Sequence, residues 1–283
     1  MTGRGRRGII LTQHRRWRPG NHRAKDSLLL KISYVGHATI IVDIGQIRVL
    51  TDPLLRDRVT FLQRHGDNPA PHMLAERSPE VVLISHLHYD HADLTSLRML
   101  PGRTLVVAPH GSGRYLGRRT GLEVYEVRAG DRLRLADVEI TALPAAHGEG
   151  FSLPLPGTAC LGYALRNSMS VYFAGDTELF EGMHAVGREF DLDLALLPVG
   201  GFTPRVGAGH LTPRTAAEAL LRLKPRVAVP IHWGAMRLPG PHALWNSADY
   251  LKRPPHTFAE HASLLSPGTD VRILQPGEST TVN

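Results

Sequence analysis

Short apolar runs separated by turn residues dominate the chain from residue 28 onward, and this pattern predicts many β-strands. Runs of about four to eight residues rich in Val, Ile and Leu are typical of buried strands. We expect strands at Leu28–Val35, Thr39–Ile44, Ile47–Thr51, Val81–Ser85, Thr104–Ala108, Leu122–Val127, Leu133–Leu135, Val138–Leu143, Ala159–Leu165, Ser170–Ala174, Leu194–Leu197, Val227–Ile231 and Val271–Leu274. The polar segments Arg56–Ser78 and Pro144–Gly157 are expected to be loops, and the first is a candidate lid.

Helical periodicity is concentrated in the second half of the chain. We expect helices at Asp93–Leu100, Glu178–Val186, Pro213–Leu223 and Ala243–Lys252. Asp93 is expected to cap the first of them, and Thr212, followed by a proline, the third. Many early strands followed by helix–strand alternation predict an α/β fold with two mixed β-sheets packed face to face and helices on the outer faces.

The composition is that of an ordinary soluble protein, with 42% apolar and 21% charged residues among 283. No apolar run is long enough to cross a membrane, and the amino terminus lacks the apolar core of a signal peptide. A cytoplasmic location is therefore expected. The single cysteine, Cys160, excludes an internal disulfide, and we expect it to be an inert thiol in a buried strand.

The net charge of +7 comes from the amino-terminal tail. Residues 1–25 hold eight basic side chains and no acidic one, which leaves 25 of the 33 basic residues against 26 acidic ones in the remainder. We expect residues 1–27 to form a disordered basic tail and residues 28–283 to form the folded domain. The tail is interpreted as a solvated extension rather than an arm for anionic lipid or nucleic acid, and the core is not expected to bind nucleic acid.

Residues 86–91, with the sequence His-Leu-His-Tyr-Asp-His, place four metal-binding side chains directly after an apolar run. His86 and His88 are two residues apart and can point the same way on an extended chain, while a turn can bring Asp90 and His91 towards a second ion. Imidazole nitrogens and carboxylate oxygens suit Zn²⁺ and its neighbours in the transition series. The segment therefore predicts a divalent metal centre at the rim of a sheet.

A site with two metal ions needs further ligands from other loops. His147, Asp176 and His232 each follow a predicted strand, so each is a candidate ligand at a strand end. A glycine before Asp176 permits close approach of the backbone there.

This order of residues resembles that of the metallo-β-lactamase fold superfamily, from about Leu28 to the carboxyl end. The resemblance implies an αββα sandwich with a two-metal site on the rim between its sheets. It further implies a first metal site of His86, His88 and His147, a second site of Asp90, His91 and His232, and Asp176 as the bridging carboxylate.

Shorter motifs resemble one branch of that superfamily, which includes N-acyl-phosphatidylethanolamine-hydrolysing phospholipase D and the ascorbate-6-phosphate lactonases. They are Gly36-His37-Ala38-Thr39, Leu50-Thr51-Asp52-Pro53, Phe173-Ala174-Gly175-Asp176-Thr177, Gly209-His210-Leu211-Thr212-Pro213 and Ile231-His232-Trp233-Gly234. Only 55 residues separate Asp176 from His232, too few for the inserted domain of the RNA-processing branch.

The resulting hypothesis is a metal-dependent hydrolase that uses two divalent ions and a bridging hydroxide. Zn²⁺ is favoured, with Mn or Fe as alternatives. Asp90 would orient the hydroxide, and His210 is a candidate proton donor to the leaving group. His37 is a candidate for a substrate contact or a supporting hydrogen bond, and Asp52 for orienting a ligating histidine.

The bond cleaved is expected to be a phosphodiester, lactone or amide in a small or lipid-like molecule. Two other classes remain open: a mononuclear iron oxygenase or redox protein of the same fold, and a nucleic-acid-binding protein with a structural metal site. The oligomeric state is open as well.

Overall fold

A computed structural model describes residues 8–10, 30–148, 153, 157–201, 207–239 and 249–283 of the chain. Within these residues two large mixed sheets form the interior. The eight-stranded sheet has the order β1 (Gly8–Ile10), β10 (Arg132–Leu135), β11 (Val138–Pro144), β12 (Leu161–Arg166), β13 (Ser170–Phe173), β14 (Leu194–Pro198), β15 (Val227–Ile231) and β17 (Asp270–Val271). The seven-stranded sheet has the order β18 (Ser279–Val282), β2 (Leu30–Gly36), β3 (Thr39–Ile44), β4 (Ile47–Thr51), β7 (Val81–Leu83), β8 (Leu105–Pro109) and β9 (Glu123–Val127).

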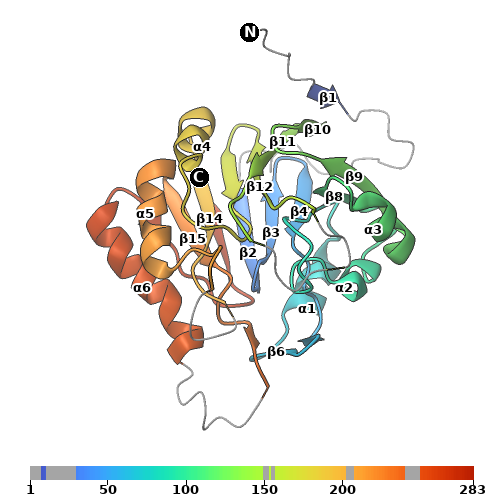
Figure 1. Ribbon diagram of the computed structural model, residues 1–283, viewed down its shortest axis with the longest axis horizontal. Coiled ribbons are helices and arrows are strands. Elements are labelled where there is room, and N and C mark those ends of the chain that lie inside the picture. The colour runs from blue at the N-terminus through green and yellow to red at the C-terminus, as the bar shows by residue number, and fades with distance from the viewer. Residues whose placement is uncertain (1–7, 11–29, 149–152, 154–156, 202–206, 240–248) are drawn as a thin grey trace.

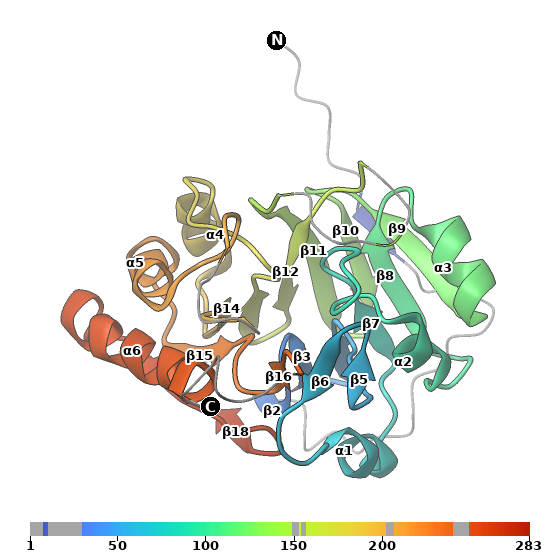
Figure 2. The same ribbon diagram turned by 60° about the horizontal axis from the view of Figure 1, so that its bottom comes forward.

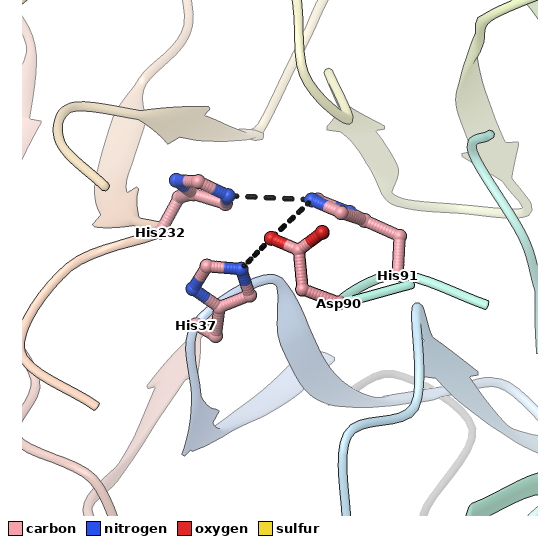
Figure 3. Close-up of side chains that lie close together, drawn as sticks. All are labelled: His37, Asp90, His91 and His232. Carbon is pink, nitrogen blue, oxygen red and sulfur yellow. Dashed lines mark hydrogen bonds and ion pairs between the residues drawn. The ribbon is translucent and has the colours of Figure 1, made fainter. Parts of the chain in front are cut away.

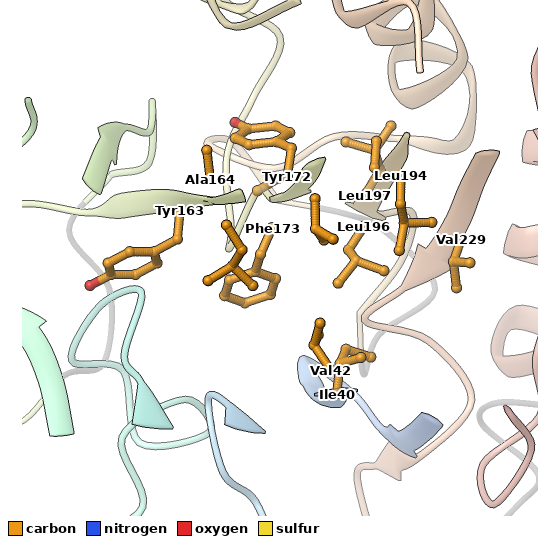
Figure 4. Close-up of a cluster of buried hydrophobic side chains, with 14 of the residues drawn as sticks. Ile40, Val42, Tyr163, Ala164, Tyr172, Phe173, Leu194, Leu196, Leu197 and Val229 are labelled. Carbon is orange, nitrogen blue, oxygen red and sulfur yellow. The ribbon is translucent and has the colours of Figure 1, made fainter. Parts of the chain in front are cut away.

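The two sheets bury one continuous apolar core between them. Ile40 and Val42 of β3 face Phe173 of β13 and Leu196 of β14 across this core (Figure 4). Neighbouring residues of these strands point to opposite faces, so Tyr172 lies on the outer side of its sheet while Phe173 lies on the inner side. Burial on both faces explains why these strands are almost continuously apolar.

Helices cover the two outer faces (Figures 1 and 2). On the side of the eight-stranded sheet lie α4 (Met183–Phe190), α5 (Pro213–Leu223) and α6 (Asp249–Leu265). On the side of the seven-stranded sheet lie α1 (Ala70–Glu76), α2 (Leu94–Arg98) and α3 (Gly113–Thr120), which pack a second apolar cluster against it. The predicted αββα sandwich is confirmed.

Both predicted helix caps are confirmed. The Asp93 side chain accepts a hydrogen bond from the main-chain nitrogen of Ser96, at the start of α2. Thr212 and Thr215 form a reciprocal capping box at the start of α5, with proline in its first turn.

The segment Arg56–Ser78 is not the irregular loop that its polarity predicted. It contains β5 (Arg58–Val59), β6 (Leu62–Arg64) and helix α1, and β6 pairs with β16 (Met236–Arg237) in a small third sheet. Helix α3 was not predicted either, because two glycines within it weaken the helical pattern. It begins where the main-chain nitrogens of Gly111 and Gly113 donate to Glu126.

Three further boundaries were wrong. Helix α4 begins at Met183 rather than Glu178, because the main chain of Glu178 bonds to Ala146 instead of starting a helix. Helix α6 runs to Leu265, well past the predicted end, although Pro254 and Pro255 lie within it. The closing strand of the seven-stranded sheet is β18, whereas the predicted strand Val271–Leu274 contributes only its first residue, to β17.

Two smaller expectations also need correction. Residues 8–10 of the expected disordered tail form β1, which pairs in parallel with β10; the rest of the tail lies outside the described residues. Cys160 precedes β12 and is partly exposed rather than buried within a strand. Burial still raises the pKa of its thiol to about 11, so the thiol is protonated at neutral pH.

Candidate metal centre

The candidate ligands meet where loops leave the carboxyl ends of the strands. Residues 86–91 follow β7, His147 follows β11, Asp176 follows β13 and His232 follows β15. The inner strands of both sheets therefore deliver donors from distant parts of the sequence to one region. Four overlapping groups of His and Asp side chains there have ligand atoms within 4.8 Å of one another.

One of these groups contains His86, His88 and His147, the residues expected in the first metal site. The Nε2 atom of His147 lies 3.2 Å from Nδ1 of His88. The rings of His86 and His88 meet edge to face, with their centroids 4.3 Å apart. This spacing places three imidazole nitrogens around one point.

A second group contains Asp90, His91 and His232, the residues expected in the second site, together with His37 (Figure 3). The Nε2 atoms of His91 and His232 are 3.3 Å apart, and Oδ2 of Asp90 is 3.6 Å from Nε2 of His91. His37 lies at the edge of the group, with its Nε2 2.8 Å from Oδ2 of Asp90.

Asp176 lies between the two groups. Its Oδ2 is 3.1 Å from Nε2 of His91 and 3.4 Å from Nε2 of His232, and it also forms a group with His147 and His210. The Nε2 atom of His210 is 3.2 Å from the same oxygen. This is the place that a carboxylate bridging two ions would occupy.

Supporting hydrogen bonds fix the outer side of several imidazoles. Asp52 is fully buried, and its Oδ2 lies 2.8 Å from Nδ1 of His91. The same carboxylate accepts hydrogen bonds from the main chain and the hydroxyl of Ser85, a residue that the sequence did not single out. A main-chain carbonyl supports His232 in the same way: Nδ1 of His232 lies 2.9 Å from the oxygen of Gly200. Such contacts fix the ring and leave Nε2 available to ligate an ion.

Three residues of the site have a strained backbone conformation. His37, Asp52 and His232 have φ angles of 60°, 33° and 62°, in the left-handed region that residues with a side chain seldom adopt. Each such residue costs about 1–3 kcal/mol and persists only where the surroundings enforce it, which is common at functional sites.

The donor set fits metal ions. The Nε2 atom of His86 and the Oδ1 atom of Asp176 are both buried, and neither has a hydrogen-bond partner. Buried polar atoms are rarely left unpaired, so two such atoms within one cluster of donors indicate a missing partner that binds both nitrogen and oxygen. Imidazoles and carboxylates together match Zn²⁺, Mn²⁺ or Fe²⁺.

The electrostatics of the cluster keep most imidazoles neutral. Burial lowers the pKa of His88 to about 4 and that of His232 to about 3. Burial also lowers the pKa of His86, and the neighbouring His91 lowers it further. Neutral imidazoles are the form that ligates metal.

The carboxylate of Asp176 and the imidazole of His91 are instead favoured in their charged forms. Burial alone would raise the pKa of Asp176, but His232 and His91 hold it well below its ordinary value. Burial would lower the pKa of His91, but Asp176, Asp90 and Asp52 raise it well above its ordinary value. These shifts favour a protonated His91 in the absence of metal, and a bound ion would have to displace that proton.

The expected loop Pro144–Gly157 directly contacts the segment 86–91 that carries four of the predicted ligands. The main-chain nitrogen of Leu153 donates to the oxygen of Leu87, 2.8 Å away, and the Leu153 side chain is buried. The neighbouring residues 149–152 and 154–156 lie outside the described residues. Within the described part of the chain, no helix is both long and apolar enough to span a membrane.

Comparison with known proteins agrees with this geometry. Residues 47–233 match the family model described as "Beta-lactamase superfamily domain". Proteins named "UPF0173 metal-dependent hydrolase" from Opitutus terrae and Methanopyrus kandleri are each 31% identical to the chain. The alignments cover 89% and 88% of this chain and 100% and 99% of those proteins.

Among solved structures, Igni18 from Ignicoccus hospitalis, titled a metallo hydrolase, superposes with a TM-score of 0.68 at 23% identity. The match covers 90% of this chain and 99% of that one and supports the same fold. The family match over most of the chain, together with a cluster of donors at the rim between two sheets, identifies the chain as a member of the metallo-β-lactamase superfamily.

Proposed function

We propose that this protein is a metal-dependent hydrolase with a dinuclear site. The observation that carries the proposal is the convergence of seven donors on one small volume in which His86 Nε2 and Asp176 Oδ1 are buried and unpaired. Curated relatives that align over almost their whole length are named metal-dependent hydrolases, which supports the reaction class.

The ligands divide into two sets around Asp176. His86, His88 and His147 would hold one ion, and Asp90, His91 and His232 would hold the other. When bound, two such ions lower the pKa of a water between them and polarise the bond to be cleaved.

The protein's own residues supply orientation and proton transfer. Asp90 is held by His37 and would orient the attacking water while taking part in the second site. Although burial opposes it, hydrogen bonding to the carboxylate of Asp176 raises the pKa of His210, so its imidazole can carry a proton near neutral pH. His210 is partly exposed, as a donor of that proton to a departing alcohol or amine would have to be.

The substrate is proposed to be a phosphodiester, a lactone or an amide in a small or lipid-like molecule. The motifs around His37, Asp52 and His210 support the branch that includes the phospholipase D and the lactonases named above. All three residues contact predicted ligands, which supports a role for these motifs in the site.

The deciding experiment is metal quantitation on purified protein, followed by a hydrolysis screen of the same sample. Two equivalents of Zn²⁺ or Mn²⁺ per chain, with turnover of one of the three bond types that ceases after chelation, is the expected result. One equivalent of iron with oxygen uptake and no hydrolysis would instead establish the oxygenase alternative. Metal-free protein with full activity would overturn both.

A further inference from the structure

The segment that carries His210 is fixed at its carboxyl end. Leu211 is fully buried, and Thr212 caps α5. His210 therefore directly precedes two residues that are fixed in the fold. The turn at Gly209 lies directly against the loop that carries His147.

Gly209 approaches that loop more closely than any residue with a side chain could. A Cβ atom built on Gly209 would lie 2.9 Å from the main-chain nitrogen of Gly148 and 3.2 Å from Nδ1 of His147. The first distance is to backbone, which cannot swing aside. The φ angle of Gly209 is +80°, which also disfavours side-chain-bearing residues.

This approach brings a carbonyl onto the imidazole. The oxygen of Gly209 lies 2.7 Å from Nδ1 of His147, so Nδ1 carries the hydrogen and donates it. The remaining nitrogen, Nε2, is then the one with a free lone pair, and it points towards His88.

The opposite side of the same loop is tied down as well. The main-chain nitrogen of Ala146 donates to the hydroxyl of Thr177, and the main-chain oxygen of Ala146 accepts from the nitrogen of Glu178. His147 is therefore held between the segment that follows Asp176 and the turn at Gly209. The next residue after that turn, His210, contacts Asp176.

We propose that Gly209 is a positioning residue of the first metal site: its carbonyl selects the tautomer and orientation of His147, and its lack of a side chain permits that contact. The expected effect on metal affinity rests on the proposed function, whereas the tautomer of His147 can be measured without metal. Gly209 itself offers no side-chain ligand to a metal ion.

The test compares four variants with the wild-type chain. Gly209→Ala introduces both the clash and the backbone strain, and Gly209→Asn retains the clash while tolerating the left-handed conformation better. Gly207→Ala is the control in the same segment, because a Cβ there meets only an ordinary contact at 4.0 Å. Gly121→Ala controls for strain alone, since it has a φ of +77° and open space around it.

The first readout is ring-¹⁵N NMR of histidine in the metal-free proteins, with His147 assigned from a His147→Gln spectrum. We expect the Nδ1–H form in the wild type and both controls, and loss of that preference in both Gly209 variants. The second readout is metal titration, in which affinity at the first site should fall about 10- to 100-fold in the Gly209 variants only. Circular dichroism establishes that each variant is folded.

A Gly209→Asn protein that keeps both the Nδ1–H form and the wild-type affinity would overturn the proposal. An equal loss of metal affinity in Gly207→Ala would also overturn it, because the effect would then belong to the segment and not to the contact. Wild-type protein that binds no metal would refute the proposed function, while the NMR comparison would still decide the role of Gly209.

Discussion

The Nε2 atom of His37 lies 2.8 Å from Oδ2 of Asp90, and both side chains are largely shielded from solvent. The His37 ring also lies 3.9 Å, centroid to centroid, from that of His232, and its main-chain oxygen accepts a hydrogen bond from the nitrogen of His232. One residue at the end of β2 thus supports two predicted ligands of the second site. It acts through the imidazole and the backbone at once.

Replacing His37 tests this support. His37→Ala removes the donor to Asp90, and we expect kcat/KM to fall about 10- to 100-fold together with affinity for the second metal ion. His37→Gln retains a nitrogen donor at a similar reach and should recover part of the loss. Steady-state kinetics on the substrate found by screening, with metal titration alongside, measures both effects. Equal activity of His37→Ala and the wild type would show that the hydrogen bond is incidental.

Removal of the carboxylate that we propose to bridge the two ions should separate metal binding from folding. Asp176→Ala is expected to lose one or both metal ions, because Asp176 lies near donors of both proposed sites. The fold should largely persist, since the carboxylate makes no hydrogen bond to the main chain among the described contacts. Metal content by mass spectrometry and far-UV circular dichroism give the two readouts. Full occupancy in this variant would contradict the bridging assignment, and Asp67→Ala, at an exposed position, is the control.

Asp52 is expected to contribute to stability even without metal. Asp52→Ala leaves the main-chain nitrogen of Ser85 and Nδ1 of His91 buried without their partner. Removal of one member of a buried charged pair costs about 3–5 kcal/mol, so the free energy of unfolding should fall by about that amount. Urea titration of chelator-treated protein measures it. A loss no larger than that of the exposed Asp67→Ala, about 0.5 kcal/mol or less, would show that Asp52 is unimportant for folding.

The stability of the metal-free protein should be greatest near pH 6.5. His88 and His232 have pKa values of about 4 and 3 in the folded state, below the ordinary value near 6.5. Between these values the unfolded chain binds more protons, so stability falls as the pH falls. The pKa of His91 is raised by its carboxylate neighbours, so its contribution is complete below pH 6.5 and is lost as the pH rises.

Thermal unfolding of chelator-treated protein from pH 4.5 to 9 measures this profile. His232→Gln should flatten the acid side and leave the alkaline side unchanged. A wild-type transition temperature that does not change between pH 6.5 and 4.5 would contradict the direction of these shifts. Metal-loaded protein should lose activity as the pH falls towards about 4, because protonated imidazoles do not ligate and His88 stays neutral above its pKa of about 4.

Much of this architecture could be predicted from local pattern. The apolar run 81–85 and the four donors after it were recognisable because a strand and its following loop are adjacent in the sequence. The same holds for His147, Asp176 and His232, each of which follows a strand. Errors occurred where the local signal was weak or was overridden, as in α3 with its glycines and at Glu178, whose backbone bonds to Ala146.

The supporting contacts of the site could be predicted less well from the sequence. Asp52 was proposed to orient a ligating histidine, and the structure pairs it with His91. Ser85 was missed, although it stands immediately before His86. The carbonyls of Gly200 and Gly209 could not have been found, since every residue carries the same main-chain oxygen.

The order of apolar runs and the identities of the metal-binding side chains determined, by themselves, an αββα sandwich with a cluster of donors at strand ends. The tertiary structure alone decided which loops face one another, which atom of each imidazole is left free, and which backbone adopts the left-handed conformation at His37, Asp52 and His232. Periodicity and side-chain chemistry depend only on the types and order of the residues, whereas contacts between distant backbones depend on how the two sheets pack.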